Sequence, residues 1–305
     1  MNKKINTFLN TESISRLTSI TAAIIFFVIN SFAQNSLAKL SNYSEIKLSA
    51  YQEKQFSVKA IVGGKERTFL FDTGEGITMI SPQVAADLGC EPWGNIVGFR
   101  MLGERFDAPR CDEVKFDIAN SVFKVPNTII YDLAKISGAG APPIDGAIGL
   151  DMFAGRTITL EMSSKRLIIE TEKSAKRRMK AGIEIPLRIS RSEGGALDVN
   201  LGVRTDRGLL WMELDSANAG PTVFVAPAVS ALLNLDAKNR QPQTVNLDFG
   251  SGLTFEGKAR VFPDMIIDGN IGMQFLSNRI ITLDLKNSRA WVSSIIISSS
   301  QSAKH

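Results

Sequence analysis

Two aspartates stand at matching places in the two halves of this 305-residue sequence, each directly after an apolar stretch. The triplets that they open are Asp72-Thr73-Gly74 and Asp215-Ser216-Ala217. Two carboxyl groups held close together share one proton, because both cannot ionise cheaply. The ionised group can accept a proton from water while the protonated group donates to a substrate carbonyl oxygen. These residues therefore predict hydrolysis by direct attack of water.

The scarcity of histidine argues against most other hydrolytic chemistry. The single histidine, His305, is the last residue of the sequence. Ser-His-Asp and Cys-His sites need an imidazole beside the nucleophile, and zinc hydrolases usually need histidine ligands. The sequence also has no G-x-G-x-x-G or P-loop pattern that would bind a nucleotide. We therefore expect neither a metal ion nor a cofactor.

An internal repeat relates the two halves of the chain. Residues 149–168 and 272–291 align without a gap, with identical glycine, arginine and threonine residues at equivalent positions. The alignment extends upstream, where Asp72 falls opposite Asp215 and Pro82 opposite Pro227. Length differences are confined to loops, as expected for two homologous lobes.

The pattern within each half predicts strands and one short helix. Hairpins are expected over 56–72 and 196–215, helices with proline in their first turn over 82–88 and 227–233, and half-buried strands over 157–162 and 280–285. We therefore expect a mostly β protein with two related barrel-like lobes.

The N-terminus is typical of an export signal. Residues 1–33 combine basic residues, an apolar run and small residues at a cleavage-like site. Export to the periplasm or outside the cell is expected, with an uncleaved membrane anchor as the less favoured alternative. The expected domains are a signal peptide at 1–33, an N-terminal lobe at 34–172, a linker at 173–180, a C-terminal lobe at 181–297 and a polar tail at 298–305. The linker holds the only basic cluster and indicates a solvated connector, so no nucleic-acid partner is expected.

At its two aspartate triplets, the chain resembles the bilobal pepsin-like and bacterial retropepsin-like aspartic peptidases. In that family an apolar strand leads into D-[ST]-[GA], and a later apolar-apolar-Gly segment packs over the loop. The matching later segments here end in Ile148-Gly149 and Ile271-Gly272. The resemblance implies two homologous six-stranded-type acid-protease barrel lobes in one chain, each with a short helix.

The resemblance also implies a role for each motif residue. Asp72 and Asp215 would be catalytic, with Thr73 and Ser216 exchanging hydrogen bonds between the lobes and Gly74 and Ala217 supporting the pair. The expected activity is that of an aspartic endopeptidase acting on a peptide or protein as a monomer, without an obligate partner chain.

Two departures from the family pattern support an alternative without catalysis. Glu75 stands where the family usually has a small residue, and Ala217 replaces the usual glycine. The alternative function is a catalytically inactive protein that binds an extended peptide in the same cleft.

The resemblance also implies a flap over the substrate, and residues 93–107 are the candidate because they contain glycines suited to a hairpin turn. For Trp93 and Phe99 in this segment we favour core packing over substrate contact. Cys90 and Cys111, the only cysteines, bracket the segment. An exported chain tolerates a disulfide between them, while two ordinary core thiols fit the sequence equally well.

Overall fold

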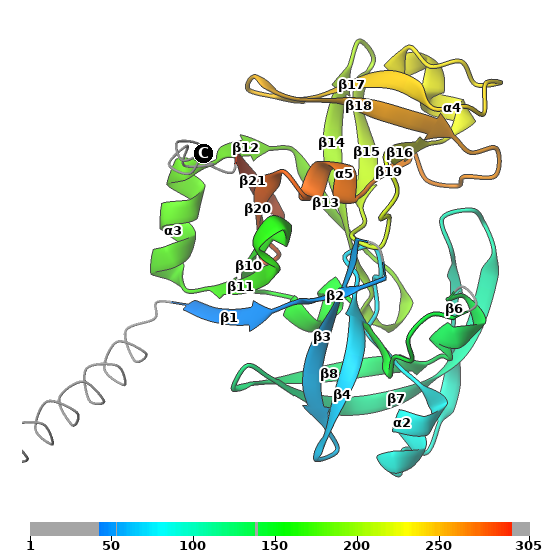
Figure 1. Ribbon diagram of the computed structural model, residues 1–305, viewed down its shortest axis with the longest axis vertical. Coiled ribbons are helices and arrows are strands. Elements are labelled where there is room, and N and C mark those ends of the chain that lie inside the picture. The colour runs from blue at the N-terminus through cyan, green and yellow to red at the C-terminus, as the bar shows by residue number, and fades with distance from the viewer. Residues whose placement is uncertain (1–42, 53, 138–139, 295–305) are drawn as a thin grey trace, which may run out of the picture. The chain divides into compact units, whose positions relative to one another are not determined.

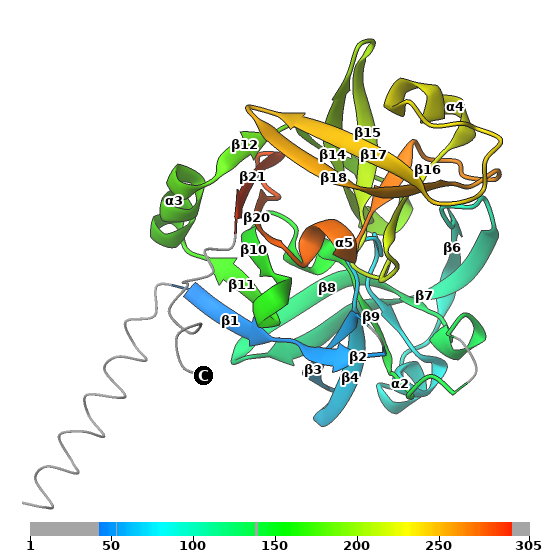
Figure 2. The same ribbon diagram turned by 45° about the horizontal axis from the view of Figure 1, so that its top comes forward.

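The computed structural model describes residues 43–52, 54–137 and 140–294, which form three β-sheets (Figures 1 and 2). The described residues belong to one compact unit, and their strands confirm the expected mostly β class. The expected signal peptide and polar tail lie outside the described residues. In the described part, no helix is long and apolar enough to cross a membrane.

An eight-stranded sheet, here called the N-lobe sheet, is built from the first half of the chain. Its strand order is β2-β3-β4-β9-β5-β8-β7-β6. The strands are β2 (Ser49–Tyr51), β3 (Gln55–Val62), β4 (Lys65–Phe71), β5 (Met79–Ile80), β6 (Trp93–Phe99), β7 (Arg105–Ile118), β8 (Ser121–Ile130) and β9 (Gly146–Ile148). β4 alternates buried and more exposed side chains, as a strand packed on a core does, and it ends at the buried Phe71.

A seven-stranded sheet, here called the C-lobe sheet, repeats this plan. Its strand order is β13-β14-β15-β19-β16-β18-β17. The strands are β13 (Leu187–Arg191), β14 (Leu197–Thr205), β15 (Gly208–Leu214), β16 (Thr222–Val225), β17 (Gln243–Gly250), β18 (Leu253–Val261) and β19 (Gly269–Ile271). The hairpin β14–β15 corresponds to β3–β4, and the parallel pair β15–β19 corresponds to β4–β9.

A six-stranded sheet combines strands from both halves, which the sequence did not predict. Its order is β1-β11-β10-β20-β21-β12. The strands are β1 (Tyr43–Lys47), β10 (Thr157–Glu161), β11 (Arg166–Glu170), β12 (Ile183–Ile185), β20 (Arg279–Asp284) and β21 (Arg289–Ser294). β10 and β20 come from equivalent parts of the repeat and pair antiparallel, with Thr159 opposite Thr282. Their hydroxyl oxygens lie 2.9 Å apart. The two equivalent threonines thus mark the local two-fold relation between the repeats.

Short helices connect the strands. The α-helices are α2 (Pro82–Asp87), α3 (Glu172–Ala181), α4 (Pro227–Ser230) and α5 (Met273–Leu276), and the 3₁₀ turns are η1 (Leu133–Lys135), η2 (Leu150–Phe153), η3 (Met162–Ser164), η4 (Glu193–Gly195) and η5 (Ala231–Leu233). α2 and α4 lie where the prolines predict them, and the Ser81 hydroxyl accepts a hydrogen bond from Val84 N at the start of α2.

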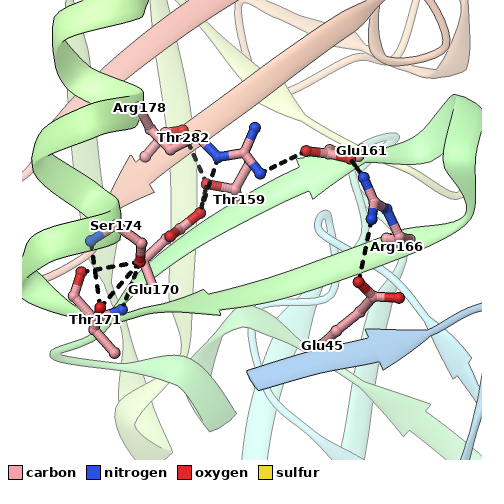
Figure 3. A network of polar contacts seen from close by, with 9 residues as sticks. All are labelled: Glu45, Thr159, Glu161, Arg166, Glu170, Thr171, Ser174, Arg178 and Thr282. Carbon is pink, nitrogen blue, oxygen red and sulfur yellow. Dashed lines mark hydrogen bonds and ion pairs between the residues drawn. The ribbon is translucent and has the colours of Figure 1, made fainter. Parts of the chain in front are cut away.

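Helix α3 covers the stretch expected to be a linker and is joined to the six-stranded sheet by ion pairs (Figure 3). Arg178 on α3 contacts Glu161 at 2.7 Å and Glu170 at 3.2 Å, and both of these carboxylates are buried. Arg166 on β11 also pairs with Glu161. Buried charges are stable in a fold only when they are paired. This network therefore fixes the segment that connects the N-lobe sheet to the C-lobe sheet.

Candidate active site

The loops that follow β4 and β15 meet and exchange hydrogen bonds. Thr73 N donates to Ser216 Oγ at 3.0 Å, and Ser216 N donates to Thr73 Oγ1 at 2.9 Å. Each hydroxyl also donates to the other loop: Thr73 to the Leu214 carbonyl at 2.8 Å and Ser216 to the Phe71 carbonyl at 3.2 Å. Thr73 and Ser216 are buried. The exchange that the resemblance implies for these residues is thus present, and it fixes the two loops against each other.

This exchange brings Asp72 and Asp215 together. Both aspartates are 9% exposed. A Cβ added to Gly74, which follows Asp72 in its loop, would lie 2.8 Å from Asp215 Cγ. Burial raises the pKa of Asp72, and the negative charge of the nearby Asp215 raises this pKa further. Two aspartates 143 positions apart in the repeat therefore form one pair.

Backbone N–H groups orient both carboxyl groups. Asp72 Oδ1 accepts a hydrogen bond from Gly74 N at 2.9 Å. Asp215 Oδ1 accepts from Ala217 N at 2.7 Å and from Asn218 N at 3.1 Å. Ala217 has no positive φ, so its methyl group causes no backbone strain in the second loop.

The predicted loop-packing residues lie directly behind the pair. Asp72 N donates to the Ile148 carbonyl at 3.1 Å, and Asp215 N donates to the Ile271 carbonyl at 2.9 Å. A Cβ at Gly149 would lie 2.1 Å from the Glu75 carbonyl oxygen, and one at Gly272 would lie 2.2 Å from the Asn218 carbonyl oxygen. Both positions require glycine because the loop backbone passes so close.

The comparisons with known proteins agree with this geometry. Residues 58–152 match a family model described as aspartyl protease. The similar solved structures include basic 7S globulin from soybean, with TM-score 0.53 and 10% identity, and conglutin gamma, a basic 7S globulin from lupine seeds, with TM-score 0.54 and 9% identity. A third is edgp, with TM-score 0.51 and 10% identity. Each match covers 83% of this chain and 95% of the other chain. The chain has an aspartic-peptidase-like fold. No curated protein matches it in sequence.

The acidic groups around the aspartic-peptidase-like pair favour protonated forms. Burial raises the pKa of Asp72 well above its ordinary value, and the negative charge of Asp215 raises it further, while the hydrogen bond from Gly74 N lowers it. Two carboxyl groups in this position share a proton at pH values where isolated aspartates are both ionised.

Four further carboxyl groups surround the pair. Burial, and then the charge of Asp72, raises the pKa of Glu75 well above its ordinary value. Burial, and then the charge of Asp215, does the same for Glu213. Burial also raises the pKa of Asp198, and it raises that of Asp151 to about 6. The sequence analysis singled out only Glu75 among these four, because the others lie in or beside strands that contain apolar residues.

Asn270 is a further site residue that the sequence analysis did not identify. Its side-chain Nδ2 donates to Asp215 Oδ2 at 2.7 Å. A signal was present in the sequence, since Asn270 occupies a position where the family motif calls for an apolar residue.

The predicted flap is the hairpin formed by β6 and β7, with Gly103 at φ +84° in its turn. The turn reaches the second half of the chain, where Ile266 N donates to the Met101 carbonyl at 3.0 Å. Trp93 and Phe99 are exposed on this hairpin, so the expectation that they fill the core was wrong. Both lie on strand β6 at the edge of the N-lobe sheet, and the Arg110 guanidinium lies 3.6 Å from the centre of the Trp93 ring.

Cys90 and Cys111 form a disulfide at the base of this hairpin, with their Cα atoms 6.1 Å apart. Cys111 lies on β7, and Cys90 lies shortly before β6 begins. The cross-link therefore ties the start of the hairpin to its second strand. In the described part of the chain, no group of three or more His, Cys, Asp or Glu side chains is arranged to hold a metal ion.

Proposed function

We propose that this protein is an aspartic endopeptidase that hydrolyses peptide bonds through a water molecule activated between Asp72 and Asp215. The observation that carries the proposal is the exchange of hydrogen bonds between Thr73 and Ser216, because it places one aspartate from each half at a single point. The likeness to aspartyl proteases over residues 58–152 supports the same chemistry.

The proposed reaction needs one ionised and one protonated carboxyl group. The ionised group accepts a proton from the water, whose oxygen attacks the peptide carbonyl carbon, and the protonated group donates to the carbonyl oxygen. The resulting tetrahedral diol breaks down when its C–N bond cleaves: the carboxyl group that took the water proton donates it to the leaving nitrogen, and the other carboxylate takes a proton from a diol hydroxyl as the new carboxylic acid forms. Neither step needs a metal ion or a cofactor.

The proposed setting follows from the same residues. The substrate is a peptide or protein held beneath the β6–β7 hairpin, and a single chain supplies both carboxyl groups, so a monomer is sufficient. We further propose that residues 1–33 direct the protein out of the cytoplasm, where a disulfide such as Cys90–Cys111 persists.

A second candidate function is peptide binding without hydrolysis. The observation that favours it is the crowding of Glu75 and Glu213 against the pair, because extra negative charge can hold both aspartates protonated. A statine-type inhibitor distinguishes the two functions, since tight binding of its hydroxyl needs a pair with one proton. Micromolar or tighter binding supports the peptidase, whereas peptide binding without inhibitor binding supports the alternative.

The variants Asp72→Asn and Asp215→Asn test the proposal directly. Each should lower kcat on a quenched fluorescent peptide library by at least about 10³-fold, because neither carboxyl group suffices alone. Asp117→Asn, at an exposed aspartate on β7, is the matched control and should keep the parent rate. Thermal unfolding checks that all three variants fold. Parent-like turnover in Asp215→Asn would refute a shared site.

A further inference from the structure

The two lobes differ in the residue pair that lies beside each aspartate. In the N-lobe sheet, Leu70 on β4 lies opposite Ala147 on β9. At the equivalent place in the C-lobe sheet, Glu213 on β15 lies opposite Asn270 on β19. The repeat thus has an apolar pair behind Asp72 and a polar pair behind Asp215.

Asn270 is fully buried and its side chain is hydrogen-bonded at both ends. Its Nδ2 donates to Asp215 Oδ2 at 2.7 Å and to Glu213 Oε2 at 3.1 Å. Its Oδ1 accepts from Asn218 Nδ2 at 2.8 Å. Every polar atom of this amide therefore has a partner.

The contacts of Asn218, which lies on the side of Asn270 away from the carboxyl groups, set the orientation of the Asn270 amide. Asn218 Nδ2 also faces the carbonyl oxygen of Thr222 at 3.4 Å. A carbonyl oxygen only accepts, so Asn218 presents its donor group on this side. Its second hydrogen then points to Asn270 Oδ1, which leaves the Asn270 N–H groups for the two carboxyl groups.

Asp215 therefore accepts more hydrogen bonds than Asp72 does. Three donors reach Asp215, from Ala217 N, Asn218 N and the Asn270 side chain. Asp72 accepts from Gly74 N at 2.9 Å and from the backbone of Ala217, and neither of these donors is a side chain. Donors that point at a carboxyl group favour its ionised form.

We propose that Asn270 is a positioning residue that holds Asp215 as the ionised member of the pair and so leaves the shared proton on Asp72. Asp215 is then the group that takes the proton from water, and Asp72 is the group that donates to the carbonyl oxygen. This assignment rests on the proposed peptidase function.

The charged groups that face the pair oppose ionisation of both aspartates, so they do not select which one carries the proton. They are Glu75 after β4, Asp151 in η2, Asp198 on β14 and Glu213 on β15, and all four are acidic. Among the described residues, no ion pair joins any of them to a lysine or arginine. Without a cation nearby, the Asn270 amide is the side-chain donor that offsets the charge of Asp215.

The variant Asn270→Ala tests this role. Alanine occupies the equivalent position in the N-lobe as Ala147, so the strand accommodates it. A hydrogen bond to a charged group is worth enough to move a titration by about one pH unit. The acid limb of the kcat profile should therefore move upward by about one unit, while KM changes less than twofold.

Two further variants serve as controls. Asn246→Ala removes an exposed side-chain amide on β17 of the same sheet and should leave the profile unchanged. Asn270→Asp keeps the side-chain size but replaces the donor, so it should shift the acid limb in the same direction as Asn270→Ala. It keeps the test open if the alanine variant fails to fold.

A titration of carboxyl ¹³C shifts in aspartate-labelled protein separates this proposal from the proposed function. In the parent, the Asp215 signal should change at lower pH than the Asp72 signal. The two signals are assigned by their loss in Asp72→Asn and in Asp215→Asn. Asn270→Ala should move the Asp215 signal upward. An Asp72 signal that changes first, or no shift in Asn270→Ala, overturns the assignment. A parent without turnover but with the expected titration refutes the peptidase function only.

Discussion

Replacing Gly74 by alanine should displace the Asp215 carboxyl group and reduce catalysis without breaking the fold. The added Cβ would lie 2.8 Å from Asp215 Cγ and 2.9 Å from its Oδ1, whereas ordinary contacts begin at 3.4 Å. The atoms must therefore separate by about 0.6 Å. Asp215 cannot turn away freely, because backbone donors hold its Oδ1 and Asn270 holds its Oδ2.

The expected magnitude follows from this displacement. A misplacement of 1 Å at a reacting group can cost about 10²-fold in rate, so Gly74→Ala should lower kcat/KM by roughly 10- to 100-fold. Overpacking costs typically about 1–3 kcal/mol of stability, which a protein of this size tolerates. Gly74 has no positive φ, so the loss comes from contact with Asp215 and not from backbone strain.

The assay is steady-state hydrolysis of a quenched peptide, with urea unfolding in parallel. Gly220→Ala is the matched control, because a Cβ there would meet Asn218 Oδ1 at an ordinary 3.5 Å. Gly220→Ala should keep the parent kcat/KM within about twofold, as expected for a tolerated surface change. A folded Gly74→Ala variant with parent kcat/KM would show that the close contact between the two loops does not govern the reaction.

Two other variants test the surroundings of the pair and the connecting helix. Glu75→Gln should shift the alkaline limb of the pH profile toward acid, because it removes a charge that opposes the second ionisation of the pair. The raised pKa of Glu75 also means that the parent loses stability as pH rises above the ordinary value of 4.5, so Glu75→Gln should be more stable than the parent in that range. Arg178→Met should lower the free energy of unfolding by about 3–5 kcal/mol in urea, because Arg166 still pairs with Glu161 but the buried Glu170 carboxylate loses its ion pair. An unchanged alkaline limb or an unchanged urea midpoint would contradict the respective prediction.

The repeat in the sequence was enough to predict much of the fold. Local patterns predicted the hairpins β3–β4 and β14–β15 and the proline-started helices α2 and α4, because these elements are stabilised by neighbours in sequence. The shared six-stranded sheet escaped prediction because β10 pairs with β20 across more than a hundred residues. Nothing in the local pattern of either strand specifies that partner.

The environment of the aspartates was harder to predict than their positions. Glu213 lies in a strand whose alternation suggests a solvent-facing side chain, yet its carboxyl group is half-buried and accepts a hydrogen bond from Asn270. Asn270 occupies the first position of the apolar-apolar-Gly motif, but it is polar where the motif has an apolar residue. Only the paired strands show that these two side chains contact each other.

The asymmetry between the lobes gives the two carboxyl groups different surroundings, which a symmetric dimer cannot do. Hydrolysis by a shared-proton pair needs one ionised and one protonated carboxyl group, and in a symmetric dimer either group can carry the proton. Fusion of the two copies in one chain lets each half change separately. Leu70 and Ala147 form an apolar pair beside Asp72, while Asn270, which lies opposite Glu213, donates a hydrogen bond to Asp215. The scaffold residues Thr73 and Ser216 must stay equivalent to hold the loops together, but the residues behind them need not. Assigning the proton to one aspartate therefore requires no change in the two-fold scaffold itself.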